Sequence, residues 1–537
     1  LRRADYVTWY LLEGLKVSPE CFRHPRPVGF RKLARVHSHE LVESLLDPET
    51  LAAVFTVHPS EVSVDDVLGT IRAAVGATVD GTRLALRRRR PVLSLLGGFH
   101  HAGRARMGPL CPVNDIAVAV ADARRRGFHG RIGVIDLDAH PPDGTADCFA
   151  DDDDVWIGSL SGCDWGPLPG RVDETVLAAG TGDKDYLRAL DELLLRMPDA
   201  ELFYVLAGGD VVAGDGLGAL GMTPDGIRER DRRVARALSG VASVWLPGGG
   251  YTPDAWRILA GTALVLGDRG SESIDERFDP LTLHYRHIQA KLGREQLTDD
   301  EFTAEDLGLD FGGAAGAPSK FLGFWTVSGL EYALERYGVL GQIARLGYRD
   351  LRVELDHATV GERMRVLGTA LGEEHTLVEL VVDIRFIEDL RVLFVNWMTM
   401  RNPRAKFTPN RPRLPGQEVP GLGLGREAAF LIAGMATRLG LAGAAFRPAW
   451  YHMAYIGRHT CRFVDPARQG RFEALVRDLQ HLTLLEATQL VADKRVFLDG
   501  EPYEWEADDM VMGLDLGDED RPAIVAERKR ARFTVSD

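Results

Sequence analysis

Three residues have the side-chain types and the positions along the chain that a metal site requires. Asp138 and His140 lie two positions apart at the end of an apolar run, and alternation along an extended chain turns positions i and i+2 to the same face. Asp210 follows another apolar run and is the natural third ligand. Two carboxylates and an imidazole leave one coordination position open, which suits a catalytic zinc ion. Asp-x-His alone could equally cap a loop, so the surrounding residues decide between the two interpretations.

Further polar residues accompany these three along the chain. His100 and His101 form an adjacent pair after a glycine turn, and Tyr251 follows three glycines that would let its phenol project into a crevice. Asp136 and Asp143 flank the proposed ligands, and each could orient one histidine of the pair. Taken singly, an exposed histidine pair or a stacked loop tyrosine would mean little. Together, each near the end of an apolar run, they indicate a catalytic site.

Four short apolar runs must position these residues. They have the pattern of buried strands separated by amphipathic stretches such as Val113–Arg126, and they are Val92–Leu96, Ile132–Leu137, Leu202–Ala207 and Val241–Leu246. This alternation predicts an α/β domain with a mainly parallel sheet. Ligands bind at the carboxyl ends of the strands in an open parallel sheet. We therefore expect the polar residues to meet in one crevice at that edge.

Four segments, in their order along the chain, resemble a known family. They are Gly97–Ala102, Ile135–Phe149, Leu206–Thr223 and Leu246–Tyr251. In these segments the sequence is similar to the zinc-dependent histone deacetylase and acetylpolyamine amidohydrolase superfamily, and the likeness covers residues 1–268. The resemblance implies an arginase/deacetylase-like fold, in which a mainly parallel sheet is flanked by helices. It also implies zinc ligands at Asp138, His140 and Asp210.

The resemblance implies a role for each remaining polar residue. His101, oriented by Asp143, would be the general base and later the general acid. His100, paired with Asp136, would be its electrostatic partner. Tyr251 would hydrogen-bond the substrate carbonyl and then the oxyanion. Zinc would polarise the carbonyl and lower the pKa of a water molecule, which completes a hydrolytic mechanism.

Some positions depart from the family pattern or extend it. Many relatives also bind potassium, which the resemblance places near the backbone of Asp136–His140 and near Ser159. Arg3 matches the arginine that lines the family's acetate-release channel. Leu168 stands where an aromatic residue commonly forms a wall of the acyl-lysine tunnel, so we expect a reduced wall.

The chain changes character after its family-like part. Charged residues cluster from Gly267 to Asp279, and small residues fill Gly312–Pro318. We expect a zinc deacetylase-like domain at residues 1–268, a connecting region at 269–320, and a C-terminal domain of mixed α+β type at 321–537.

The C-terminal part has its own pattern of elements. Thr376–Phe386 and Val392–Trp397 are predicted to form a hairpin, and helices are expected at Arg426–Leu439 and Gly470–Val491. Gly421–Gly425 leads into the first of these helices as an anion-binding loop would. The glycine pattern is weakly similar to the pyrophosphate loop of acetyl-CoA-dependent N-acetyltransferases. The alternative is a packing or oligomerisation domain, through which the protein could form a homo-oligomer.

The composition narrows the class of protein. The 537 residues are 45% hydrophobic and 27% charged, as in ordinary globular proteins. A net charge of -15 argues against a general nucleic-acid binder or a binder of anionic membranes. The longest clean apolar run, Ala428–Ala436, is too short to cross a membrane. Five scattered cysteines favour a reduced, cytoplasmic protein, and the preference for arginine over lysine suggests a GC-rich bacterial genome.

Four hypotheses of function remain. The leading one is a zinc-dependent amidohydrolase that removes acyl groups from lysine side chains or related primary amines. An acylpolyamine amidohydrolase is its close variant. An arginase-like binuclear manganese ureohydrolase shares the fold, but Asp215 is a poor candidate for the extra ligands it needs. An inactive module that recognises acyl-lysine is the non-enzymatic alternative, and the intact set of polar residues argues against it.

Overall fold

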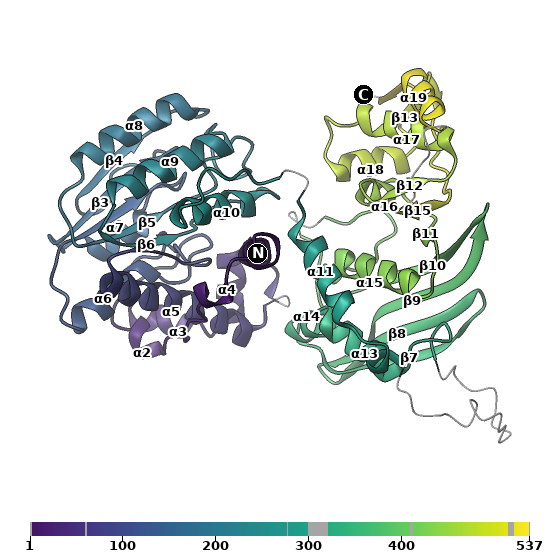
Figure 1. Cartoon of the computed structure of the whole chain (residues 1–537), viewed down its shortest axis with the longest axis horizontal. Helices are drawn as coiled ribbons and strands as arrows, with labels where there is room; N and C mark the ends of the chain where they lie inside the picture. The colour runs from purple at the N-terminus through teal and green to yellow at the C-terminus, as the bar shows by residue number, and fades with distance from the viewer. Residues whose placement is uncertain are drawn as a thin grey trace. The chain divides into compact units, whose positions relative to one another are not determined.

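The computed structural model of the chain describes residues 3–59, 62–275, 278–298, 320–408, 412–513 and 520–535. These residues form two compact units, Leu1–His284 and Tyr285–Asp537 (Figure 1). Helix α11 (Pro280–Lys291) contains the boundary between the units. The predicted connecting region therefore holds α11 and α12 (Glu295–Thr298), and its residues 299–319 lie outside the described part of the chain.

A six-stranded sheet in the order β1-β6-β5-β2-β3-β4 forms the centre of the first unit, and every neighbouring pair is parallel. This architecture confirms the predicted fold class. The strands are β1 (Pro91–Leu93), β2 (Ile132–Asp136), β3 (Val155–Ser161), β4 (Val172–Val176), β5 (Leu202–Leu206) and β6 (Ala242–Leu246).

Four of these strands match the predicted apolar runs, with one correction. The predicted continuation of this strand to Leu96 is wrong, because β1 ends at Leu93 and the Ser94 hydroxyl donates to the Leu96 carbonyl at 2.5 Å in the bend that follows. β3 and β4 were not predicted. β3 contains a glycine and three hydroxyl or indole side chains, and β4 is a short, half-exposed edge strand of mixed polarity.

Helices cover both faces of this sheet. They are α1 (Arg3–Trp9), α2 (Phe30–Leu33), α3 (His39–Ser44), α4 (Pro48–Phe55), α5 (Val64–Arg88), α6 (Asp115–Arg125), α7 (Asp143–Phe149), α8 (Asp183–Arg196), α9 (Pro224–Ala237) and α10 (Ala255–Leu266). α5, α6 and α7 supply the core on one face, and α8 and α9 supply the core on the other.

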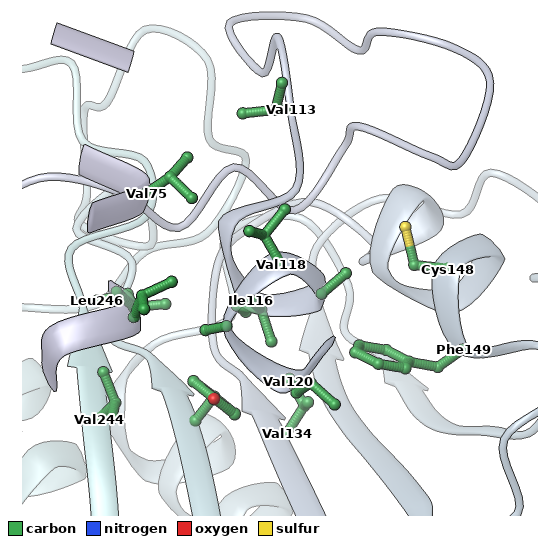
Figure 2. Packing of buried hydrophobic residues seen from close by; sticks show 14 of the residues in the cluster. Val75, Val113, Ile116, Val118, Val120, Val134, Cys148, Phe149, Val244 and Leu246 are labelled. Carbon is green, nitrogen blue, oxygen red and sulfur yellow. The ribbon is translucent and has the colours of Figure 1, made fainter. Parts of the chain in front are cut away.

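Alternate side chains of each central strand enter the two cores. Val134 of β2 belongs to one core and its neighbour Ile135 to the other. Figure 2 shows Ile116 and Val120 of α6 above Val134 and Val244 of the sheet. Burial on both faces explains why these strands are continuous apolar runs and not alternating ones.

The register of the sheet brings three strand ends to one level. Asp136 at the end of β2 is aligned with Leu206 of β5, which is aligned with Leu246 of β6. Because the strands are parallel, the segments that leave them emerge at the same edge. The sheet therefore gathers Asp138, Asp210 and the glycine turn after β6 at that edge.

The second unit is a mixed α+β structure, as predicted. Its main sheet has the order β12-β15-β11-β10-β9-β8-β7, and a smaller sheet has the order β14-β13-β16. The strands are β7 (Arg349–Ala358), β8 (Gly361–Ala370), β9 (Glu373–Ile387), β10 (Leu390–Met400), β11 (Gly443–Phe446), β12 (Cys461–Phe463), β13 (Val496–Leu498), β14 (Glu501–Pro502), β15 (Met510–Met512) and β16 (Phe533–Val535). The helices are α13 (Val327–Arg336), α14 (Val339–Arg345), α15 (Gly425–Arg438), α16 (Tyr451–Gly457), α17 (Pro466–Asp478), α18 (Leu484–Ala492) and α19 (Arg521–Arg530).

The predicted hairpin is confirmed, because β9 and β10 pair antiparallel. α15 matches the predicted helix and connects β10 to the parallel strand β11. The prediction of a single helix over Gly470–Val491 is wrong. The chain forms α17 and α18 instead, because Thr483 and Glu486 make a capping box that starts a new helix. No helix within the described ranges is long and apolar enough to cross a membrane.

Helix α5 packs so closely on the preceding chain that a single methyl group should matter. A Cβ atom at Gly76 would lie 2.2 Å from the Arg26 carbonyl oxygen, whereas a Cβ atom at Gly69 would meet nothing within 4 Å. We expect Gly76→Ala to destabilise the unit by about 1–3 kcal/mol. Gly69→Ala should stabilise it by about 0.5–1 kcal/mol, because alanine favours a helix. Calorimetric melting of both variants checks the opposite signs, and two equal gains would contradict the close packing.

Candidate active site

The three predicted metal ligands lie together at the carboxyl edge of the sheet. Ligand atoms of Asp138, His140 and Asp210 are all within 4.8 Å of one another. Nδ1 of His140 lies 3.0 Å from Oδ1 of Asp138 and 3.1 Å from Oδ2 of Asp210. Both carboxylates are buried, and the imidazole is partly exposed. Two oxygens and one nitrogen converging in this way match the donor set that zinc prefers in catalytic sites.

The charges of this cluster favour a cation. Hydrogen bonds to Asp138 and Asp210 raise the pKa of His140 to about 11. Burial and the neighbouring Asp138 carboxylate raise the pKa of Asp210. Two carboxylates in so little space repel each other unless positive charge stands between them. The residues present therefore fit a divalent metal ion.

Backbone groups from neighbouring loops hold the two carboxylates. The amide N–H of Gly249 donates to Oδ2 of Asp138 at 2.6 Å, and the N–H of His140 donates to Oδ1 at 3.1 Å. The N–H of Ala139 donates to Oδ1 of Asp210 at 3.0 Å. These bonds link the ends of β2, β5 and β6 through the ligands themselves. The carboxylates are thereby held before any metal binds.

Each histidine of the adjacent pair is bound to its predicted carboxylate. Nδ1 of His100 lies 2.9 Å from Oδ2 of Asp136, and Nδ1 of His101 lies 2.6 Å from Oδ1 of Asp143. The two imidazole rings are 4.0 Å apart between centroids. In each residue Nδ1 is engaged by a carboxylate, which leaves Nε2 as the nitrogen for chemistry.

The surroundings push the pKa values of the two histidines apart. Burial alone would lower the pKa of His100, but the carboxylates of Asp136, Asp138 and Asp210 together raise it to about 9. Burial, and then the positive charge of His100, lower the pKa of His101 despite its bond to Asp143. One imidazole is thus set to carry a proton and the other to accept one.

A buried aspartate that the sequence reasoning missed supports the loop with this pair. The carboxylate of Asp115 accepts hydrogen bonds from the N–H groups of Gly98, at 3.1 Å, and Phe99, at 2.8 Å. The hydroxyl of Thr78 donates to it at 2.6 Å. Asp115 is the first residue of α6, so its sequence signal was that of an ordinary helix start. Its partners come from distant parts of the chain and were not visible in the sequence.

Tyr251 and Arg3 meet at the glycine turn after β6. The N–H of Tyr251 donates to Oδ2 of Asp215 at 2.8 Å. The guanidinium of Arg3 donates to the carbonyl oxygens of Gly249 at 2.8 Å and Gly248 at 2.7 Å. Arg3 thus lies beside the site, as its resemblance to the channel arginine implied. Tyr251 is 43% exposed, yet partial burial and the nearby carboxylates of Asp138 and Asp210 raise the pKa of its phenol, which stays protonated and can donate a hydrogen bond.

An aromatic side chain borders the site at a position that was not predicted. The ring of Trp165 lies 5.1 Å from that of His101 and 5.9 Å from that of His140, between centroids. Its indole is 48% exposed. Leu168, where the aromatic wall was sought, packs against the hydrophobic core that includes Phe149. An indole three residues before Leu168 thus borders His101 and His140, while Leu168 itself offers no aromatic ring, as expected.

The serine of the predicted potassium site has an unusual environment. Ser159 is buried in β3, level with Asp136 of β2. Within the described part of the chain, its hydroxyl oxygen has no hydrogen-bond partner. A buried hydroxyl without a partner is costly unless a ligand completes its environment.

Comparisons with known proteins place the first unit in a family. The model of the histone deacetylase domain matches residues 2–264. Histone deacetylase 2 of Arabidopsis thaliana is 33% identical over 250 residues, which are 44% of this chain and 64% of that protein. An uncharacterized protein of Picosynechococcus is 36% identical over 186 residues, which are 33% of this chain and 61% of that protein. The chain thus spans just under two thirds of the length of these curated relatives.

The alignment with a solved structure of an HDAC homolog from Aquifex aeolicus covers 52% of this chain and 81% of the homolog's chain. The two sequences are 22% identical, and the TM-score is 0.44. The family match ends at residue 264, before the second unit begins. By its matched residues, its ordered motifs and the parallel sheet that carries them, the N-terminal half of this chain belongs to the histone deacetylase family.

Proposed function

We propose that the protein is a zinc-dependent deacylase that hydrolyses N-acyl groups from lysine side chains or related primary amines. The observation that carries this proposal is that the possible metal site and the two histidine–carboxylate pairs lie together at one edge of the sheet. A metal site alone could be structural. A base beside it, with its own orienting carboxylate, is the arrangement that hydrolysis requires.

The metal would be held by Asp138, His140 and Asp210. When bound, zinc supplies a Lewis acid that polarises a carbonyl group and lowers the pKa of water. The backbone hydrogen bonds to both carboxylates keep the ligand atoms in place, so little reorganisation would accompany binding.

His101 is the proposed general base. Asp143 holds its Nδ1, so Nε2 can take the proton from the attacking water and later deliver it to the leaving amine. The low pKa of the imidazole keeps it ready to accept that proton at neutral pH. His100 lies beside it, and its bond to the buried Asp136 carboxylate raises its pKa, which suits its proposed part as an electrostatic partner. Water adds to the acyl carbon, the C–N bond breaks, and a carboxylate and an amine leave.

Tyr251 is the proposed donor to the reacting carbonyl oxygen. Its phenol keeps its proton because burial and the nearby carboxylates raise the pKa. A hydrogen bond that strengthens as negative charge develops on that oxygen lowers the barrier to reaction. Trp165 supports an elongated substrate, since its half-exposed indole could lie along the aliphatic part of an acyl-lysine side chain.

The geometry does not favour a binuclear ureohydrolase. Both oxygens of Asp215 accept backbone N–H groups, from Leu217 and Gly218 on one side and Tyr251 on the other. Among the described residues, Asp138, His140 and Asp210 are the one group of side chains arranged to hold a metal. We further propose that potassium binds near Ser159, where it would satisfy the buried hydroxyl.

Removal of the metal tests the proposed chemistry directly. We expect the full-length protein to hydrolyse acyl-lysine peptides or acylpolyamines, to lose that activity with a strong chelator, and to regain it with stoichiometric zinc. The two substrate classes, assayed side by side, identify the preferred amine. Activity that survives complete removal of metal, or a requirement for manganese and not zinc, would reject the proposal.

A methyl group at Gly249 should damage the metal site without removing a ligand. Its Cβ atom would lie 2.3 Å from Oδ2 of Asp210 and 2.9 Å from Oδ2 of Asp138. We expect Gly249→Ala to lower zinc affinity by about 10–100-fold, because it displaces both carboxylates. The matched control is Gly216→Ala, where the new atom meets nothing within 4 Å. Elemental analysis and metal competition should separate the two variants, and equal zinc content and affinity would argue against the ligand assignment.

Tyr251→Phe removes only the proposed donor and keeps the ring. We expect kcat to fall by about 10²–10³-fold, the usual effect of losing one such donor. KM should change much less, since the interaction strengthens only in the transition state. Zinc content should be unchanged, because Tyr251 is not a ligand. A kcat within about threefold of the wild type would be too small a change for the loss of an oxyanion donor. Tyr251 would then be an ordinary loop residue.

A further inference from the structure

The carboxylate that orients His101 has a second strong partner. Oδ1 of Asp143 lies 2.6 Å from Nδ1 of His101, and Oδ2 accepts a hydrogen bond from Nη2 of Arg106, also at 2.6 Å. The side chain of Asp143 is 17% exposed and that of Arg106 is 52% exposed. The chain Arg106–Asp143–His101 therefore runs from the protein surface to the proposed base.

The main chain presents Arg106 in a defined place. The N–H of Gly103 donates to the Arg106 carbonyl oxygen at 3.0 Å, which closes a tight turn directly after the histidine pair. Further along, Gly108 and Cys111 exchange backbone hydrogen bonds and close the loop. Arg106 is thus not a surface side chain on a free loop. Its backbone is tied within five residues of the imidazole that it influences.

The other histidine–carboxylate pair shows what such a second partner does. Oδ2 of Asp136 bonds His100, while its Oδ1 accepts the backbone N–H of Asp138 at 3.1 Å. Both oxygens are engaged, so the carboxylate plane cannot turn about the Cβ–Cγ bond. That torsion is otherwise broad and easily rotated. In the second pair, within the ranges that the structure describes, no backbone N–H bonds the other oxygen of Asp143, and the guanidinium of Arg106 bonds it instead.

We propose that Arg106 is a positioning residue, which fixes the plane of the Asp143 carboxylate and through it the orientation of the His101 imidazole. This inference rests on the proposed function, in which His101 is the base. A charge-assisted bond from a planar guanidinium suits this task, since it adds direction as well as strength. An exposed ion pair would contribute little to stability. Its effect should therefore appear in turnover and not in folding.

The first test replaces the guanidinium and keeps the aliphatic stem. We expect Arg106→Met to lower kcat about 10-fold, the lower end of the effect of removing an outer-shell partner, with KM and zinc content unchanged. Arg106→Lys retains a charged donor and should recover part of the loss. Arg104→Met is the matched control, because Arg104 lies on the same loop but pairs with Asp151 and the Cys148 carbonyl. Its kcat should stay within about twofold of the wild type, since a surface ion pair matters little.

A double-mutant cycle tests whether Arg106 acts through Asp143. Once Asp143→Asn has removed the carboxylate, adding Arg106→Met should cost no further turnover. Independent losses that multiply would overturn the proposal, as would an unchanged kcat in Arg106→Met. A rise in KM alone would also overturn it, because Arg106 would then contact the substrate directly.

A spectroscopic measurement separates this inference from the proposed function. The short bond between His101 and Asp143 should give a downfield imidazole N–H proton resonance, which His101→Ala removes. We expect Arg106→Met to shift or broaden this resonance, whether or not the protein proves to be a deacylase. An identical resonance in the variant would overturn the positioning role. A shifted resonance in a protein that hydrolyses no acyl-amine would leave that role intact and reject the proposed function.

Discussion

The site depends on hydrogen bonds from backbone amides of one strand end to the ligand carboxylates of another. The Gly249 N–H on Asp138 joins the segments after β6 and β2, and the Ala139 N–H on Asp210 joins those after β2 and β5. The first is a short bond of 2.6 Å and the second is a buried bond of 3.0 Å, and hydrogen bonds to carboxylates contribute more than those between neutral groups. The parallel register brings these segments level, and the amides then fix the distances between ligands. Glycine is needed at Gly249 because any side chain there would meet both carboxylates.

This arrangement concentrates negative charge in a buried place. Asp136, Asp138 and Asp210 are each buried within the same strand ends. Uncompensated carboxylates there would be very costly, so each is matched to a backbone N–H or an imidazole. The same charge is what raises the pKa of His100, whereas burial beside that cation lowers the pKa of His101. The fit to a metal ion and the separation of the two histidine pKa values therefore both follow from the same buried carboxylates.

The sequence revealed the parts of this design that lie close together along the chain. Asp138 and His140 are two residues apart, and the apolar runs before each motif exposed the central strands, because burial on both faces leaves a continuous signal. Residues whose role depends on partners far away in the sequence could not be recognised from the sequence. Asp115 looked like a helix start, and Trp165 stood alone in a polar loop. β4 was missed because an edge strand buries only part of one face. The late helix was predicted as one piece because a capping box inside a helical pattern is easily overlooked.

The two histidine–carboxylate pairs differ in how far they lie from solvent, and this difference matches the chemistry expected of each. Asp136 is fully buried and its second oxygen is held by backbone, so the pair it forms with His100 is rigid and isolated. Such a pair can keep a fixed charge but cannot readily exchange a proton. Asp143 is 17% exposed, its second oxygen is held by a surface arginine, and the ring of its histidine lies 5.1 Å from that of the half-exposed Trp165. The His101 imidazole is itself buried, so the partial exposure belongs to its carboxylate partner. The exposure of Asp143 removes the backbone support available deeper in the fold, which is why a side chain replaces it.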